Sequence, residues 1–401
     1  MKMGNCCSST ALNAQAGSDI SDISDISHTY DYVEHSFASR WENTFTLLGS
    51  GGFSEVYLVK NRKTGVLAAA KVMSKKDMDD TDRAAVIAEV NFMRKLQHPN
   101  IVQFIDYFDE EEYMYVIIEY LAGGTLFDRV SAKQSYNEKE ARDLVYIFLS
   151  SLKFCHDRDI VHRDIKPENM LMASDSDDAN VKLADFGLSI HLPNEEKCFH
   201  ACGTPNYIAP EMLTRPAVGY SKPVDMWAVG CIAYILLGGY APFDVYGEDK
   251  ESMRELYSMI RKGQYEFDPE EWDPVSDEAK GLIRGLLCVD SKKRLTVDQA
   301  IAHPWVQRAG DELAARNLDK NLKKFRKFMA KRKFKAAVRG IIAANKFRAI
   351  IESLTKVASD GDAKAAAATE AAAATEAAEA TEGAGEEAAT AAEGVGVTLD
   401  E

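Results

Sequence analysis

The sequence predicts an α+β protein in two lobes, in which a small lobe of strands precedes a larger lobe of helices. Runs rich in β-branched and aromatic residues, typical of strands, come early in the chain, at residues 55–59, 66–73 and 115–118. A helix is expected among them over residues 82–96. Longer helical patterns follow, at residues 138–156, 224–238 and 276–287. Because Gly123-Gly124 separates the two regions, we expect a hinge over residues 119–124.

Four segments of different composition divide the chain. Residues 1–44 are polar and poor in core-forming side chains, which predicts a disordered arm. Residues 45–306 are dense in apolar side chains and are the expected globular domain. Residues 307–356 are basic and helical in pattern, whereas residues 357–401 form a low-complexity acidic tail built mostly of Ala, Glu, Thr and Gly.

Charge and cysteine content exclude several classes of protein. The net charge of −15 argues against a chain that binds nucleic acid as a whole. The sequence contains no run of about 18 apolar residues, so we expect no membrane-spanning helix. The seven cysteines are scattered, without a paired framework or metal-ligand spacing, which favours a reducing compartment such as the cytoplasm. The charge is uneven, because residues 320–348 carry twelve Lys or Arg and no acid.

Four motifs carry most of the functional information. The run LGSGGFSEV at residues 48–56 contains glycines that let backbone amides approach phosphates without a Cβ in the way, although glycine pairs are also common in hairpin turns. The run VHRDIKPEN occupies residues 161–169, and Asp-Phe-Gly follows at residues 185–187. Ala-Pro-Glu comes next, at residues 209–211. In this order and at these separations, the motifs resemble the eukaryotic protein kinases over residues 45–306.

The resemblance implies a two-lobed protein kinase fold that transfers phosphate from ATP to serine or threonine hydroxyls of proteins. It assigns Asp164 to orient the substrate hydroxyl and accept its proton, and Lys166 to neutralise charge on the moving phosphoryl group. A lysine at this position is what serine/threonine kinases carry. Asn169 and Asp185 would hold Mg²⁺, since both offer the oxygen ligands that this hard cation prefers.

The same resemblance predicts how ATP is held. Lys71 follows Val56 by fifteen residues and is expected to contact the phosphates and to pair with Glu89 of the helix. The residues expected to line the nucleotide site are Leu48, Gly49, Gly51, Val56, Ala69, Lys71, Ile118, Glu119, Leu121, Leu171 and Asp185. Two structural contacts are also implied, an ion pair between Glu211 and Arg294 and an anchor from Asp225 to the catalytic-loop backbone. Met93, Phe104, His162 and Phe186 are expected to stack between the lobes.

Within the kinases, several runs resemble the calcium/calmodulin-dependent group. They are HPNIV at residues 98–102, GGTLFDR at 123–129, ACGTP at 201–205 and AHPW at 302–305. The basic extension resembles the autoinhibitory and calmodulin-binding segment of that group. Its apolar anchors would be Phe334, Val338, Ile341 and Phe347, spaced for the two Met-rich grooves of calmodulin. Two alternatives stay open, a helix lying on an anionic membrane and a helix that only packs on the large lobe.

The chain departs from that group at three positions. His200 stands where many relatives carry a phosphorylatable threonine, so we expect activity without an upstream activating kinase. Thr204 remains and is expected to bond Asp164 and Lys166. Leu318 stands where the multifunctional members carry the threonine associated with calcium-independent activity. Thr125 replaces an acid that commonly binds a basic residue of the substrate.

The first residues fit an acylation pattern. With Met3 as the start, Gly4 fits N-myristoylation, and Cys6 and Cys7 suit palmitoylation. Two acyl chains would allow association with the cytoplasmic face of a membrane. Translation from Met1 would instead leave Gly4 internal. The alternative function for the whole chain is a calmodulin- or membrane-binding pseudokinase scaffold, which the intact catalytic residues disfavour.

Overall fold

The computed structural model describes residues 36–50, 54–174, 181–200, 202–214, 218–245, 247 and 249–335. The chain divides into two units, Met1–Phe325 and Arg326–Glu401. The first contains both lobes, and the described part of the second is the helical segment at residues 326–335. Within the described residues, no helix is long and apolar enough to cross a membrane.

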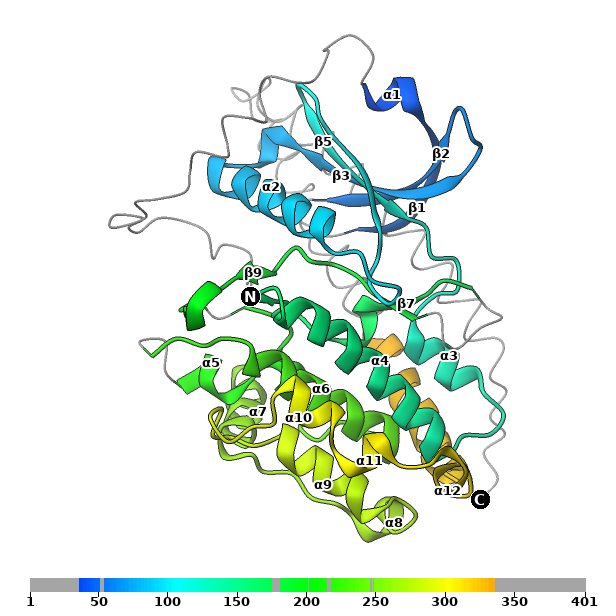
Figure 1. Ribbon diagram of the computed structural model, residues 1–401, viewed down its shortest axis with the longest axis vertical. Helices are drawn as coiled ribbons and strands as arrows, with labels where there is room; N and C mark the ends of the chain where they lie inside the picture. The colour runs from blue at the N-terminus through cyan, green and yellow to red at the C-terminus, as the bar shows by residue number, and fades with distance from the viewer. Residues whose placement is uncertain are drawn as a thin grey trace, which may run out of the picture. The chain divides into compact units, whose positions relative to one another are not determined.

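The small lobe is a five-stranded antiparallel sheet with one long helix beside it (Figure 1). In spatial order its strands are β1 (Trp41–Ser50), β2 (Glu55–Asn61), β3 (Leu67–Ser74), β5 (Tyr113–Glu119) and β4 (Phe104–Asp109). Helix α2 (Asp80–Lys95) begins at a capping box in which Asp79 and Asp82 bond each other's backbone N–H. The expected strands and the helix at residues 82–96 are therefore confirmed.

The amino-terminal boundary of the small lobe differs from the prediction of a disordered arm over residues 1–44. Helix α1 (Phe37–Arg40) leads directly into β1. Phe37 stacks on Tyr115 with ring centroids 4.2 Å apart, and Trp41 is buried in the same apolar cluster. These two aromatic side chains bury enough apolar surface to order a short stretch that is otherwise polar. The prediction for residues 1–35 lies outside the described residues.

The large lobe consists mainly of helices packed around α6. In chain order they are α3 (Leu126–Ala132), α4 (Glu138–His156), α5 (Pro210–Thr214), α6 (Pro223–Gly238), α7 (Lys250–Lys262), α8 (Pro269–Trp272), α9 (Asp277–Leu286), α10 (Val297–Ile301), α11 (Pro304–Gln307) and α12 (Gly310–Ala314). Every residue of α6 after its first is buried, which explains why this helix is apolar on all sides. Helices α4 and α9 pack against it.

Two pairs of short strands carry the loops of the lobe interface. They are β6 (Ile160–Val161) with β9 (Ile190–His191), and β7 (Met170–Met172) with β8 (Val181–Leu183). The hinge is held to β7, because Gly123 N donates to Met172 O and Met172 N donates to Gly124 O, each at 2.9 Å. A Cβ on Gly123 would lie 2.6 Å from the Cβ of Met172, so this close approach requires glycine.

The first unit extends past residue 306, where the sequence places the end of the globular domain. Residues 319–335 are helical, and the side chains of Leu318, Leu322 and Phe325 are buried. Asn321 Nδ2 donates to the carbonyls of Leu237 and Glu271, the second at 2.8 Å. Residues up to 325 are thus part of the packing of the large lobe.

Candidate active site

A lysine and two carboxylates meet where β3, α2 and the loop after β8 come together. Lys71 Nζ lies 3.1 and 3.0 Å from the two carboxylate oxygens of Glu89 and 4.0 Å from Asp185 Oδ1. Burial acts to lower the pKa of Lys71, but the charges of Glu89 and Asp185 outweigh it and raise that pKa above its ordinary value. Lys71 therefore stays cationic at neutral pH, in the position that the resemblance to protein kinases implies.

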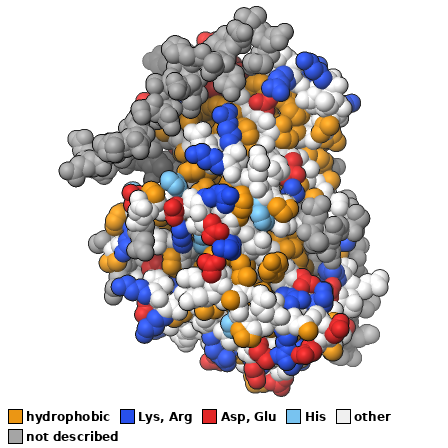
Figure 2. Space-filling model, in the orientation of Figure 1, with side chains coloured by type: hydrophobic (Ala, Val, Ile, Leu, Met, Phe, Trp, Pro, Cys, Tyr) orange, Lys and Arg blue, Asp and Glu red, His pale blue; other side chains and the backbone are white. Residues whose placement is uncertain are grey.

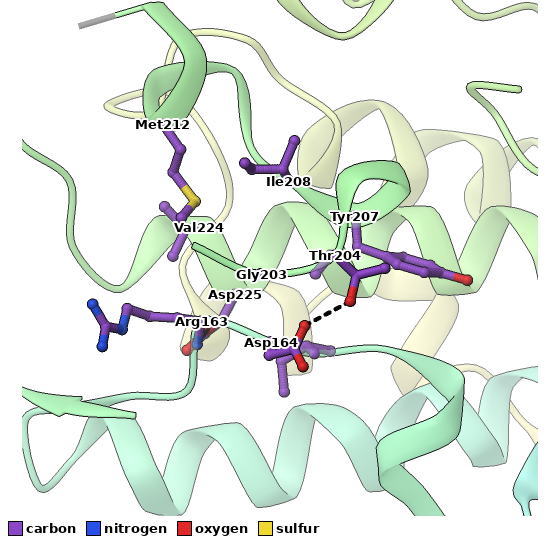
Figure 3. A pocket seen from close by; sticks show the side chains of 11 residues that line it. Arg163, Asp164, Gly203, Thr204, Tyr207, Ile208, Met212, Val224 and Asp225 are labelled. Atoms are coloured by element: carbon purple, nitrogen blue, oxygen red, sulfur yellow. Dashed lines mark hydrogen bonds between the residues drawn. The ribbon is translucent and has the colours of Figure 1, made fainter. Parts of the chain in front are cut away.

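The catalytic loop between β6 and β7 gathers polar groups around one carboxylate. Lys166 Nζ lies 2.5 Å from Asp164 Oδ2, and the hydroxyl of Thr204 donates to Asp164 Oδ1 at 2.8 Å, the bond drawn in Figure 3. Asn169 Nδ2 donates to the Asp164 backbone carbonyl at 2.9 Å. Because Asp164 is only 6% exposed, these bonds fix which way its oxygens face.

A buried aspartate on α6 holds the backbone of this loop. The carboxylate of Asp225 accepts from His162 N at 2.9 Å and from Arg163 N at 2.8 Å. His156 Nε2 lies 2.8 Å from the same carboxylate. Burial acts to raise the pKa of Asp225, but the hydrogen bonds that its carboxylate accepts from His156 and from the backbone N–H of His162 outweigh it and lower that pKa below its ordinary value. Asp225 is therefore ionised and positions the residues directly before Asp164.

His162 itself is held as a neutral ring. Its Nδ1 accepts from Asp164 N at 3.3 Å, and its Nε2 lies 3.3 Å from the carbonyl of Ala184, to which it donates. The ring packs edge-on against Phe186 with centroids 4.9 Å apart, as the predicted stack requires. Burial lowers the pKa of His162, because an imidazolium ring away from water is costly. The bond that Nδ1 accepts from Asp164 N also leaves no place for a second ring proton.

The segment after β9 lies directly on the catalytic loop. Gly203 has a φ of +96°, and a Cβ there would lie 2.6 Å from the carbonyl oxygen of Arg163, so only glycine fits.

Farther along, Arg294 binds both carboxylate oxygens of Glu211, at 2.6 and 2.9 Å, and its side chain is fully buried. The expected pair of Glu211 and Arg294 is confirmed. A small pocket beside the loop is lined by Asp164, Thr204, Tyr207, Ile208, Met212 and Val224 (Figure 3).

Comparisons with known proteins agree with this geometry. The family model described as "Protein kinase domain" matches residues 43–306, about two thirds of the chain. The chain belongs to the protein kinase family. Among curated relatives, it is 41% identical to a calcium/calmodulin-dependent protein kinase type 1 of Macrobrachium nipponense over 73% of this chain and 82% of the relative. Its membership of the calcium/calmodulin-dependent group follows from this match.

Type II members of the group are similar to a comparable degree. The chain is 40% identical to the calcium/calmodulin-dependent protein kinase type II of Caenorhabditis briggsae over 78% of this chain and 58% of that protein. It is 39% identical to the subunit delta of Oryctolagus cuniculus over 78% of this chain and 57% of that protein. The chain thus spans less than two thirds of the length of these relatives.

In this kinase domain, the residues expected around the nucleotide lie on the facing strands of the small lobe and on β7. Val56 pairs with Lys71 across β2 and β3, and Ala69 pairs with Ile118 across β3 and β5. Gly49 pairs with Val56 at the end of β1. The remaining described members of the set are Leu48 in β1, Glu119 at the end of β5, Leu121 in the hinge, Leu171 in β7 and Asp185 in the loop after β8. Charged side chains of both signs gather where the lobes meet on the face shown in Figure 2.

The hinge also contains an ion pair that sequence reasoning missed. Lys182 Nζ, on β8, lies 2.7 Å from Glu119 Oε1, which also accepts from Gln103 N at 2.7 Å. The pair joins a strand of the small lobe to a strand of the large lobe. Because 63 residues separate its members, no local pattern could have indicated it.

Several predicted site residues lie outside the described part of the chain. They are Gly4, Cys6 and Cys7 of the acylation pattern, Gly51 of the glycine-rich run, and Val338, Ile341 and Phe347 of the basic extension. Phe334 is described, and its side chain is 70% exposed at the end of the helical segment.

Acidification should destabilise this domain partly through His162. When the pKa of a histidine is lower in the folded than in the unfolded chain, acid favours the unfolded chain. The free energy of unfolding then falls as the pH drops below the unfolded pKa of about 6.5, by up to about 1.4 kcal/mol per pH unit. We expect the free energy of unfolding, measured with urea, to fall between pH 7.5 and pH 5.5. His162→Phe should lose less over that interval, although His98 and His303, whose pKa values are also lowered, still contribute. An equal loss in both proteins would contradict the assignment.

Proposed function

We propose that this chain is an ATP-dependent kinase of protein serine and threonine hydroxyls. The observation that carries the proposal is the convergence on Asp164, whose two carboxylate oxygens are taken by Lys166 and Thr204 while Asn169 holds its carbonyl. A carboxylate held in this way is suited to orient a hydroxyl and accept its proton. The pair of Lys71 and Glu89 supplies the cation that such a reaction needs for phosphate.

Each side chain has a separate task in the proposed reaction. Asp164 accepts the proton of the substrate hydroxyl, and Thr204 keeps its carboxylate turned toward that hydroxyl. Lys166 offsets the negative charge that moves between the oxygens, as a fixed cation close to Asp164. Lys71 binds phosphate oxygens of ATP, and Glu89 keeps the ammonium in place.

The donor set around Asp185 fits a magnesium ion. Asp185 offers a half-exposed carboxylate, and Asn169 offers an amide oxygen. In proteins Mg²⁺ is usually held by one or two carboxylates, with waters and substrate phosphates completing its coordination. Bound there, Mg²⁺ would neutralise phosphate charge.

The proposal extends to control by the basic helix and by calcium-loaded calmodulin. The relatives are named calcium/calmodulin-dependent, which supports the part of the proposal that concerns calmodulin. Leu322 and Phe325 anchor the start of the helix, and Lys324 reaches Glu271 at 2.6 Å. Residues 326–335 then carry six Lys or Arg, and Phe334 is exposed. A basic helix with an exposed aromatic residue matches the acidic, Met-rich surface of calmodulin. Without calmodulin, the segment after Phe325 would restrict access to substrate.

Phosphate transfer tests the proposed reaction. With ATP, Mg²⁺ and a serine peptide, the purified chain should transfer phosphate, and Asp164→Asn should lower kcat by at least about a hundredfold because the general base is lost. Asp185→Asn should abolish transfer by weakening the metal site. Asp277→Asn, at a side chain 96% exposed, is the matched control and should behave as the unchanged chain. If the unchanged chain transfers nothing, the scaffold alternative takes precedence.

Truncation tests the proposed control. A chain that ends at Phe325 keeps the buried anchors and loses the rest of the extension, so its calmodulin-free activity should rise by about fivefold or more and no longer respond to calcium-loaded calmodulin. A chain that ends at residue 356 loses only the acidic tail and should remain restrained. Equal calmodulin-free activity in all three chains would refute autoinhibition.

A further inference from the structure

The side chain of Arg163 turns away from the catalytic pocket, although its backbone lies beside Asp164 (Figure 3). Its Nη1 lies 3.1 Å from Cys198 Sγ and 3.3 Å from the hydroxyl of Tyr220. Its Nε donates to the carbonyl of Leu188. All three acceptors are uncharged groups. A guanidinium has five N–H donors in a fixed fork, so it can hold several acceptors at once.

Two of the acceptors belong to the activation segment, which we define as residues 185–211. Leu188 follows the Asp-Phe-Gly motif at its start, and Cys198 lies at its midpoint. Tyr220 comes after the segment and pairs with Cys198 through two backbone bonds of 2.9 and 2.8 Å. The Arg163 backbone is fixed by Asp225. The Arg163 side chain, on a fixed backbone, therefore holds the start and the middle of this long segment.

The hydroxyl of Tyr220 is the centre of this cluster. It donates to the carbonyl of His200 and accepts from Arg163 Nη1, and Cys202 Sγ lies 3.8 Å away. Burial raises the pKa of both Tyr220 and Cys202, so each keeps its proton at neutral pH. Tyr220 and Cys198 are each about 5% exposed, and such buried bonds are costly to leave unmade.

We infer that Tyr220 and Cys198 are positioning residues that order the activation segment without a phosphate. The inference rests on the proposed kinase function and deepens it. His200 offers no hydroxyl for phosphorylation. Kinase activation segments are commonly ordered by bonds between a phosphate and an arginine, whereas Arg163 here is bonded by a thiol, a phenol and a carbonyl. Order in this segment also affects the catalytic centre. Gly203 contacts Arg163, and Thr204 bonds Asp164, only while the segment is ordered.

Hydrogen exchange and kinetics on the full chain test this inference. The protein is treated with phosphatase, and mass spectrometry verifies that residues 185–211 carry no phosphate. Tyr220→Phe should speed amide exchange over residues 188–204 and lower kcat/KM for a serine peptide, each by about tenfold, because it removes a bond to a charged donor. The KM for ATP should stay within about twofold, since Lys71 and Glu89 are untouched.

A matched pair of variants separates positioning from packing. Cys198→Ser keeps an acceptor for Arg163 and should stay close to the unchanged chain, whereas Cys198→Val keeps the volume and should follow Tyr220→Phe. Tyr146→Phe, at an exposed tyrosine of α4, controls for loss of a hydroxyl elsewhere. The pair also keeps the test decisive if Tyr220→Phe does not fold.

The two readouts distinguish failure of the inference from failure of the proposed function. Unchanged exchange over residues 188–204 in both Tyr220→Phe and Cys198→Val would overturn the inference, whatever the activity. If the protein without substitutions transfers no phosphate, the proposed function is overturned. The exchange rates would still decide whether the cluster orders the segment.

Discussion

The buried carboxylate of Asp225 determines where the rest of the catalytic apparatus lies. It projects from α6, whose apolar surface is covered on all sides, and it accepts two backbone N–H groups of the catalytic loop. An ionised group in such surroundings is stable only when it is fully bonded. The stability of the helical core and the position of Asp164 are therefore linked through one side chain.

The backbone conformation of two residues near the catalytic loop also depends on the packing of the large lobe. Arg163 and Asp185 adopt left-handed φ angles of 68° and 61°, which are unfavourable for residues with a Cβ. Arg163 is held by Asp225, and Asp185 is followed by Phe186, whose ring is fixed against His162. The packing of the large lobe thus maintains two strained residues. Arg163 directly precedes Asp164, the proposed base, and Asp185 is the residue proposed to hold Mg²⁺.

Much of this arrangement could be predicted from sequence, because kinase motifs are contiguous runs in which each residue type has its own chemistry. The Lys71–Glu89 pair, the Asp164 cluster and the Glu211–Arg294 pair all meet as expected. The contacts that were missed join residues far apart in the chain without a motif. Lys182 contacts Glu119, and Arg163 contacts Tyr220, because the packing of strands and helices brings these distant parts of the chain together. The order of residues 36–44 was missed because two aromatic residues stand within a polar run.

The most direct measurement is the turnover of Asp225→Asn beside the unchanged chain, at a temperature where both are folded by circular dichroism. An asparagine keeps the shape but turns a donor toward one of the two N–H groups. Leaving that group unbonded costs about 1–3 kcal/mol. We expect kcat for a serine peptide to fall by at least about tenfold, with Lys71 still able to bind ATP. An Asp225→Asn protein with the kcat of the unchanged chain would contradict it, because the catalytic loop would then be positioned without the Asp225 carboxylate.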